Sequence, residues 1–368
     1  MALPREIISL SRYYGSNPEY VIAGGGNTSY KEGDSLWIKA SGASLADIDE
    51  SGFVCLSRKK LDKISDAVYS KNPGKREEEV KQDLKSAIIG NTNKRPSVET
   101  SLHNLLNYSY IVHTHPFTVN ALLCSVKAEQ LTGKLFGDEV LFVEYTDPGY
   151  ILFKKTEKEV SKYIKLHSKE PSVIFLQNHG MIVCGENAGD IHSQSDRITR
   201  IVKSLFTRKL PALDFLPAGN DSKGIIDQFN RYLENRGLTC VFNNNDLIKL
   251  YVQGDKEFKR TARPFTPDNI VYCKSKYLFP GGKAEKIISD MESFESRNDY
   301  YPRIIGLEKT GLLSLGNNKQ SATRSMEVFQ DMMKISYLSE NFGGPKFLTL
   351  EQINFIDSWE AENYRRQV

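Results

Sequence analysis

Short apolar runs and longer amphipathic segments follow one another along most of the chain. Runs rich in β-branched and other apolar residues are typical of strands, and they lie at 35–42, 53–56, 111–115, 140–145, 172–177 and 181–185. Apolar residues at helical spacing predict helices up to about Tyr14, from Arg95 to Leu106, at 118–126, in the lysine-rich stretch after Gly149 and at 187–209. Within the second of these helices, Pro96 suits the first turn and Ser97 suits the N-cap.

Part of this pattern occurs twice. Residues 302–318 align without gaps on residues 171–187 at a constant offset of 131, and identical Pro, Ile, Leu, Gly, Gly and Asn residues coincide. A helical pattern follows both segments. Because both glycines stay in register, the similarity exceeds shared strand propensity and indicates an internal duplication. The second copy has Thr310 in place of His179, and no histidine follows residue 210.

A length of 368 residues suggests two domains, and with the repeat it predicts one at 1–212 and a degenerate copy without metal ligands at 213–368. The net charge of +3 provides no global attraction to nucleic acid or membrane. Five scattered cysteines form no CxxC pair, as expected in a reducing compartment. No apolar run approaches transmembrane length and no signal-peptide pattern opens the chain. We therefore expect a cytoplasmic protein.

Three histidines stand at strand-like positions where they could act together. His113 and His115 are two residues apart, so a strand places both on one face. His179 follows a later strand and precedes a glycine. A histidine pair of this kind is more often a coincidence than a metal site, but a third, distant histidine completes a three-imidazole face of the type found in catalytic zinc sites.

Glu99 lies fourteen residues before His113, at the start of the helix that precedes the histidine strand. A carboxylate there could be a fourth metal ligand or a general base whose pKa is raised by burial. A first-turn acid stabilised by the helix dipole is an equally good interpretation. His103, one turn later, is interpreted as a packed or surface histidine.

The glycine-rich turn at 24–27 lacks the GxGxxG and P-loop spacings, so nucleotide binding is unsupported. Turns of small polar residues can nevertheless offer hydroxyl and backbone N–H donors to an anion. Such residues are Asn27, Ser41, Gly42 and Ser97. Taken one by one, each is an ordinary turn residue.

Five separated motifs together resemble the class II aldolase/adducin family, over about residues 10 to 205. They are Gly-Gly-Asn-Thr-Ser at 25–29, Lys-Ala-Ser-Gly at 39–42, Pro-Ser-Val-Glu at 96–99, His-Thr-His at 113–115 and Gln-Asn-His-Gly at 177–180. The chain also looks similar to the aldolase part of bacterial rhamnulose-phosphate aldolase/dehydrogenase fusions. It contains no GxGxxG segment of a dehydrogenase, and we expect no redox activity.

The resemblance implies a three-layer α/β/α sandwich with a central, mostly antiparallel sheet. It implies a zinc ion, or another divalent cation, held by His113, His115 and His179, with Glu99 as the acid/base residue. Asn27, Ser41, Gly42 and Ser97 match the family's phosphate pocket. Val98 departs from the pattern, because the aldolases often have a second phosphate-binding serine there. Tyr145 matches a tyrosine that donates a proton across a subunit interface, although a buried strand-end tyrosine would look the same.

The implied activity is cleavage of a ketose or deoxyketose phosphate, such as a fucose- or rhamnose-derived one, to dihydroxyacetone phosphate and an aldehyde through an enediolate that the cation stabilises. A pentulose-phosphate 4-epimerase, or a related dehydratase or decarboxylase, could use the same site. An adducin-like interaction module is a third alternative, although its metal ligands would be expected to be lost. The expected partners are a small sugar phosphate and further copies of the chain, as a homo-oligomer.

Overall fold

The computed structural model describes residues 3–280 and 283–359. The chain divides into two compact units. Of these residues, unit 1 comprises 3–205 together with 358 and 359, and unit 2 comprises 206–280 and 283–357. Among the described residues, no helix is long and apolar enough to cross a membrane. The predicted domain limits at 212 and 213 remain a prediction.

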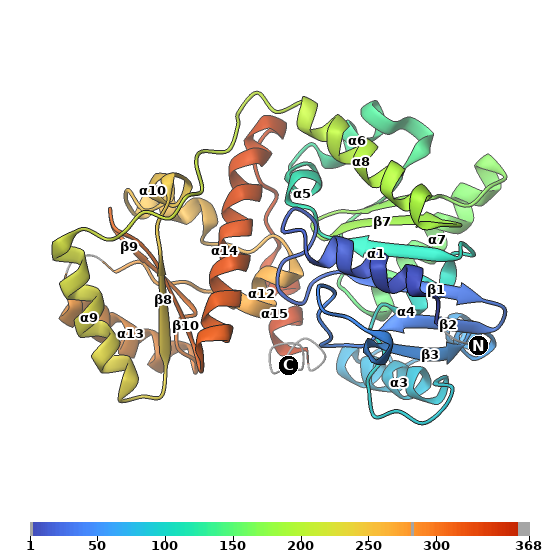
Figure 1. Cartoon of the computed structure of the whole chain (residues 1–368), viewed down its shortest axis with the longest axis horizontal. Coiled ribbons are helices and arrows are strands. Elements are labelled where there is room, and N and C mark those ends of the chain that lie inside the picture. The colour runs from blue at the N-terminus through green and yellow to red at the C-terminus, as the bar shows by residue number, and fades with distance from the viewer. Residues whose placement is uncertain (1–2, 281–282, 360–368) are drawn as a thin grey trace. The chain divides into compact units, whose positions relative to one another are not determined.

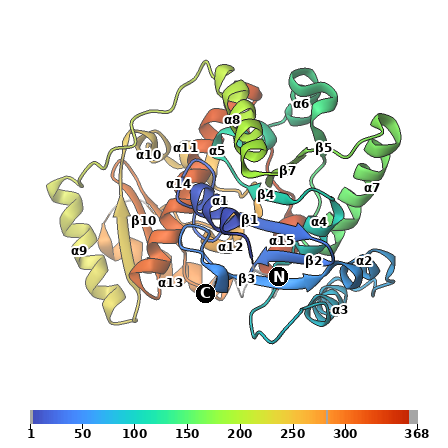
Figure 2. The same ribbon diagram turned by 45° about the vertical axis from the view of Figure 1, so that its right-hand side comes forward.

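Unit 1 is built around a seven-stranded sheet with the order β3-β2-β1-β4-β7-β6-β5 (Figures 1 and 2). Its neighbouring strands pair antiparallel except for β5 and β6. The strands are β1 (Asn27–Glu32), β2 (Ser35–Lys39), β3 (Phe53–Ser57), β4 (Tyr110–Thr114), β5 (Leu141–Val143), β6 (Val173–Leu176) and β7 (Gly180–Gly185). Each strand predicted from the apolar runs is present, and β1 is added after the glycine-rich turn.

Helices cover both faces of this sheet. One face carries α1 (Arg5–Gly15), α5 (Phe117–Leu123) and α8 (Ala188–Ser204). The other side carries α2 (Arg58–Asp66), α3 (Pro73–Ser86), α4 (Thr100–Leu105) and α7 (Tyr150–His167), whose apolar side chains pack with those of the sheet in two core clusters. Helix α6 (Ala128–Phe136) lies next to β5. The predicted α/β architecture with a central, mostly antiparallel sheet is confirmed.

The start of α4 differs from the expectation. The helix begins at Thr100, so the prediction that residues 95–99 form its first turn is wrong. Pro96 instead forms an antiparallel bridge with Ala40, and the amide of Thr100 donates to the carbonyl of Ser97. Cross-strand pairing therefore overrides the local preference of proline for a first helical turn. As a result, Glu99 sits at the N-cap position, at the edge of the helix.

Unit 2 contains a three-stranded antiparallel sheet in the order β8-β10-β9. Its strands are β8 (Thr239–Asn243), β9 (Ile304–Leu307) and β10 (Gly311–Gly316). Its helices are α9 (Asn220–Glu234), α10 (Asp246–Tyr251), α11 (Asp255–Phe258), α12 (Pro267–Cys273), α13 (Ala284–Asn298), α14 (Lys319–Ser339) and α15 (Leu350–Ser358), whose last residue belongs to unit 1. This unit is an extra C-terminal region with a small sheet.

The offset of 131 residues found in the sequence also relates the secondary structure of the two units. Strands β6 and β7 shifted by 131 give the bounds of β9 and β10, and the pairing register is preserved. The left-handed residue in the connecting turn is Asn178 (φ 56°) in one hairpin and Lys309 (φ 54°) in the other. Asn187 and Asn318 cap the helices that follow, each accepting from a backbone amide three residues on. Helices α7 and α13, before the strands, also end 131 residues apart, at His167 and Asn298. These correspondences support a duplicated α-β-β-α segment.

Candidate metal centre

Three imidazole rings meet where β4 ends and the β6–β7 hairpin turns. The ring centroids of His113 and His115 are 4.9 Å apart. The ring centroid of His179 lies 4.9 Å from that of His113 and 5.0 Å from that of His115. One ligand atom from each residue lies within 4.8 Å of the other two. His113 and His179 are buried and His115 is half-buried. The predicted approach of these three residues is confirmed.

The neighbouring backbone fixes each ring. His113 belongs to β4 and pairs with Ile182 of β7, while the amide of His115 donates to the carbonyl of Tyr20. The hairpin turn places His179 after Asn178, a residue type that tolerates the left-handed conformation adopted there. The amide side chain of Asn120 donates to the carbonyl of His179 at 3.1 Å. Strand register and turn geometry therefore bring the rings together.

Gly180 leaves no room for a side chain beneath the rings. A Cβ added there would lie 2.4 Å from the carbonyl oxygen of Thr114, 2.6 Å from Cδ2 of His115 and 3.2 Å from Nε2 of His113. Such separations are shorter than van der Waals contact. The glycine thus permits the hairpin to approach β4 closely enough for His179 to join the pair.

Gly180→Ala is expected to displace the rings and to weaken binding of a divalent cation by at least about tenfold. Overpacking of this kind costs roughly 1–3 kcal/mol. Isothermal titration with zinc would measure the affinity. The matched control is Gly133→Ala in α6, where an added Cβ meets nothing within 4 Å and is expected to leave the affinity unchanged. Equal affinities for the two variants would contradict this account of Gly180.

The donor set fits a divalent metal ion. Nδ1 of His113 lies 3.0 Å from Oε2 of Glu99, and the ring therefore donates its Nδ1–H to that carboxylate. Its Nε2 is buried and has no hydrogen-bond partner among the described residues. Metal-binding histidines commonly donate one N–H to a carboxylate and bind the ion through the other nitrogen. An uncompensated buried nitrogen beside two further imidazoles is what such a site requires.

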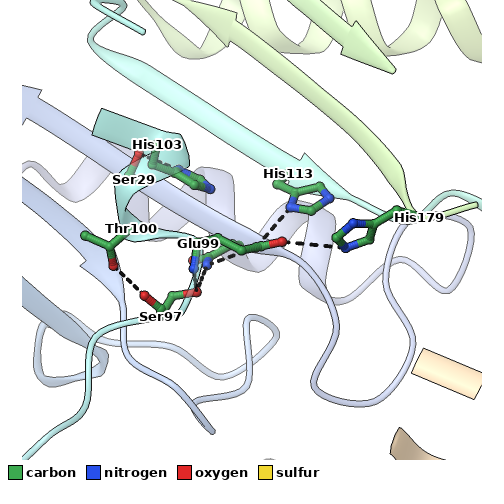
Figure 3. Close-up of polar contacts among 8 residues, drawn as sticks. Ser29, Ser97, Glu99, Thr100, His103, His113 and His179 are labelled. Carbon is green, nitrogen blue, oxygen red and sulfur yellow. Dashed lines mark hydrogen bonds and ion pairs between the residues drawn. The ribbon is translucent and has the colours of Figure 1, made fainter. Parts of the chain in front are cut away.

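Glu99 is the carboxylate that joins two of the rings (Figure 3). Besides its contact with His113, its Oε1 lies 3.5 Å from Nε2 of His179. Burial opposes ionisation of Glu99, but the neighbouring His113, with His179 and His103, holds the pKa of the carboxyl well below its usual value. The expectation of a pKa raised by burial is therefore wrong. Glu99 is thus ionised at neutral pH.

Two of the small polar residues singled out from the sequence, Asn27 and Ser97, contact Glu99. Asn27 pairs with His113 in the sheet, and its Nδ2 donates to Oγ of Ser97 at 2.5 Å and to Oε2 of Glu99 at 3.4 Å. The amide of Ser41 donates to the carbonyl of Arg95, so the turn containing Gly42 (φ 85°) runs alongside the strand segment that leads to Ser97. Asn27 and Ser97 thus lie beside Glu99, and the turn with Ser41 and Gly42 is bonded to the segment that leads to Ser97.

Tyr145 lies next to the hairpin that carries His179. Its amide donates to the side-chain oxygen of Gln177 at 3.2 Å, and its hydroxyl donates to Asp147 at 3.4 Å. Burial, followed by the charge of Asp147, raises the pKa of the Tyr145 hydroxyl above its usual value. The hydroxyl therefore remains protonated at neutral pH. Its catalytic role remains a prediction.

His103 is the residue whose position the sequence left open. It is fully buried, and its Nδ1 lies 2.8 Å from Oγ of Ser29 (Figure 3). Burial, more than any other cause, lowers the pKa of its ring to about 3, so the imidazole is neutral. One of its nitrogens lies within 4.8 Å of ligand atoms of Glu99 and His113. The one sequence signal was its position four residues after Glu99, which places it one helical turn further on.

Unit 2 has other residue types at the positions of two histidines of the cluster. Thr310 occupies the position of His179 in the repeated hairpin, and its Oγ1 lies 3.2 Å from Oγ of Ser222 at the start of α9. Phe242 pairs with Leu313 of β10, as His113 pairs with Ile182 of β7. Leu313 and Ile182 are equivalent in the repeat, so Phe242 takes the place of His113. The second hairpin therefore keeps the backbone arrangement with side chains of different chemistry.

A mixed sheet with helices on both faces, and a buried three-imidazole cluster at the end of its central strand, define an α/β protein with a site suited to a divalent cation. Residues 5–203 match the family model of the Class II Aldolase and Adducin N-terminal domain. This match covers more than half of the chain, which belongs to that family.

Two related sequences illustrate the relationship. The chain is 29% identical over 192 residues to the uncharacterized oxidoreductase YuxG of Bacillus subtilis, a match that covers 50% of this chain and 26% of YuxG. It is 27% identical over 183 residues to the L-fuculose phosphate aldolase of Methanocaldococcus jannaschii, covering 47% of this chain and 80% of that enzyme. The matched region is thus about a quarter of the first relative and most of the second.

Among solved structures, the N-terminal class II aldolase domain of a conserved protein from Thermoplasma acidophilum is 26% identical. The match covers 54% of this chain and 91% of the Thermoplasma acidophilum domain, with a TM-score of 0.46.

Proposed function

We propose that this protein is a zinc-dependent aldolase that cleaves a ketose or deoxyketose phosphate into dihydroxyacetone phosphate and an aldehyde. The observation that carries the proposal is the carboxylate of Glu99, which lies against two rings of a three-histidine cluster. Zinc is favoured because it binds readily to three imidazoles with a further position left open. Membership of the family adds sugar-phosphate chemistry, and the M. jannaschii relative carries that activity in its name.

The residues of unit 1 divide the work of such a reaction. A cation held by His113, His115 and His179 would supply Lewis acidity to the substrate carbonyl. Glu99, ionised and within reach of that position, accepts and returns the proton at the carbon next to the carbonyl. Tyr145, which stays protonated, is the candidate donor to the aldehyde oxygen.

Ser97 is suited to binding the phosphate group. Its Oγ accepts hydrogen bonds from the side chain of Asn27 and from the amide of Glu99 at 3.2 Å. Because both neighbours are donors, the hydroxyl hydrogen of Ser97 is left to point toward a bound anion. Ser41 and Gly42 would add donors from the adjacent turn. These contacts would keep the three-carbon fragment in place while the bond breaks.

Unit 2 is proposed to be a degenerate copy without a metal site. Thr310 and Phe242 stand where His179 and His113 stand in unit 1. Neither hydroxyl nor phenyl groups replace imidazole as a zinc ligand. We further propose a cytoplasmic homo-oligomer, in agreement with the sequence expectations.

A screen of ketose phosphates with purified, zinc-supplemented protein tests the function. Release of dihydroxyacetone phosphate, measured with a coupled reductase, is the expected result. Conversion of a pentulose phosphate to its isomer without release of a fragment would instead identify an epimerase. Absence of a stoichiometric divalent metal from the purified protein would overturn both enzymatic proposals and favour an interaction module.

Ser97→Ala is expected to raise KM for a phosphorylated substrate by about tenfold, the worth of one hydrogen bond to a charged group. The reaction of the same ketose without its phosphate should change much less. Ser44→Ala, which removes an exposed hydroxyl bound to Asp47, is the control. An unchanged KM in the Ser97 variant would remove this residue from the phosphate site.

A further inference from the structure

Strand β1 presents a row of polar side chains to the segment that carries Glu99. Residues two apart along a strand share a face, and here they are Asn27, Ser29 and Lys31. The first contacts Glu99, as described above. The second contacts Nδ1 of His103, and the ammonium of the third donates to the carbonyl of Tyr108 at 3.1 Å. The row therefore binds the segment before, within and after α4.

The contact between Ser29 and His103 fixes a ring that lies close enough to Glu99 to act on its carboxylate. The backbone amide of His103 donates to the carbonyl of Glu99 at 3.0 Å, so the two residues are joined by the first turn of α4. The ring is fully buried, and its Nε2 has no hydrogen-bond partner among the described residues. In Figure 3 this nitrogen points away from Ser29, to the side on which Glu99 and His113 lie.

The protonation of the ring follows from its neighbours. A carboxylate is an acceptor only, so a bare nitrogen lone pair on its side of the ring would be repelled, whereas an N–H would be attracted. Nε2 therefore carries the hydrogen. Nδ1 is then the acceptor, and the Ser29 hydroxyl donates to it. The Ser29 hydroxyl and the imidazole then form a hydrogen-bonded pair, and the ring acts on Glu99, of which a ligand atom lies within 4.8 Å, through its N–H dipole and not through a direct hydrogen bond.

A second cation between Glu99, His103 and His113 is the competing interpretation, because ligand atoms of these three residues also lie within 4.8 Å of one another. His113 argues against it. Its Nδ1 faces the carboxylate and its Nε2 lies on the side of Gly180 and the other rings. To serve two ions the ring would have to lose its Nδ1–H, and the bond to Glu99 that orients it would be lost.

We infer that His103, anchored by Ser29, is a positioning residue that holds the Glu99 carboxylate in its reactive orientation and is not itself a metal ligand. This inference rests on the proposed function, since it concerns the residue that moves the proton. Partners of this type, one step removed from the reacting groups, typically change activity by about 10- to 100-fold when they are removed.

The kinetic test compares two replacements of the ring. His103→Leu is expected to lower kcat about 10- to 100-fold, to change KM less than about twofold, and to leave one metal equivalent per chain. His103→Gln places an amide N–H near the position of Nε2 and is expected to restore most of kcat. Unchanged kcat in the leucine variant, or equal loss in both variants, would overturn the inference.

Ser29→Ala tests the anchor, and Thr28→Val is its matched control. Thr28 is the next residue of β1, equally buried, and its hydroxyl bonds to Ser11 on the opposite face at 2.7 Å. We expect Ser29→Ala to lower kcat severalfold per metal-loaded chain and Thr28→Val to affect only thermal stability. Equal kcat losses in the two variants would identify a purely structural role.

Nitrogen-15 NMR of the histidine rings in metal-free protein tests the geometry without any reaction. The expected spectrum has His103 as the neutral Nε2–H tautomer, with a change in its Nδ1 signal in Ser29→Ala. The opposite tautomer would overturn the inference. So would a metal content that falls from two equivalents per chain in the wild type to one in His103→Leu. Because these readouts need no substrate, they remain decisive even if the proposed aldolase activity is wrong.

Discussion

His179→Ala is expected to abolish stoichiometric metal binding and to reduce turnover by about a thousandfold or more. The cluster keeps only two imidazoles in this variant, from the last residues of β4 and the residue just after it, and loses the ligand that the hairpin supplies. Lewis-acid assistance is worth several kcal/mol, and each 1.36 kcal/mol corresponds to about tenfold in rate. Elemental analysis of the purified variant, followed by the aldolase assay, measures both effects.

The fold of this variant should be retained. Asn120 binds the backbone carbonyl of residue 179, which alanine keeps. The hairpin of unit 2 adopts the same turn with Thr310 at the equivalent position, so the turn does not need histidine. Circular dichroism and thermal melting should resemble wild type. His167→Ala, which removes a ring packed on Tyr163 at the end of α7, is the control, and normal metal content in His179→Ala would refute its assignment as a ligand.

Glu99→Gln is expected to retain the metal but to lower kcat by about 10²- to 10⁴-fold, the usual contribution of a positioned general base. Glutamine has the size of glutamate, and its amide oxygen can still accept the Nδ1–H of His113. It cannot take a proton from carbon at neutral pH. A second readout is exchange of the C–H proton of dihydroxyacetone phosphate with deuterated solvent, which requires the base but no aldehyde.

Glu77→Gln is the matched control for that experiment. Glu77 is another largely buried carboxylate, whose pKa is raised chiefly by desolvation, and it contacts Arg76 and the amide of Tyr150 rather than the histidines. Its replacement is expected to leave kcat unchanged. Near-wild-type turnover and solvent exchange in Glu99→Gln would remove Glu99 from the chemistry.

Features set by local periodicity could be predicted from the sequence. Alternation along a strand placed His113 and His115 on one side, and the apolar runs marked the strands of the large sheet other than β1. The repeat was detected because a constant offset preserves both glycines of the hairpin, and the same offset relates β6 and β7 to β9 and β10. The family motifs also include Asn27, Ser97 and Glu99, which lie beside the cluster.

Contacts between distant segments could not be predicted in this way. The helix of Glu99 begins later than its sequence suggests, because the bridge between Pro96 and Ala40 keeps the preceding residues extended. Glu99 also has a lowered pKa, since the two imidazoles beside it outweigh the effect of burial. Both outcomes depend on neighbours more than ten residues away in the chain.

The sequence by itself determined which residues can take part: three histidines in strand and turn positions, one acidic residue before them, and a second copy that lacks the histidines. Only the tertiary structure decided how they act together. It places Glu99 between His113 and His179, and it turns His103 from an unassigned helical residue into a buried partner of Ser29. The physical reason is that periodicity sets the face on which a side chain lies, whereas sheet register and helix packing set what that face meets.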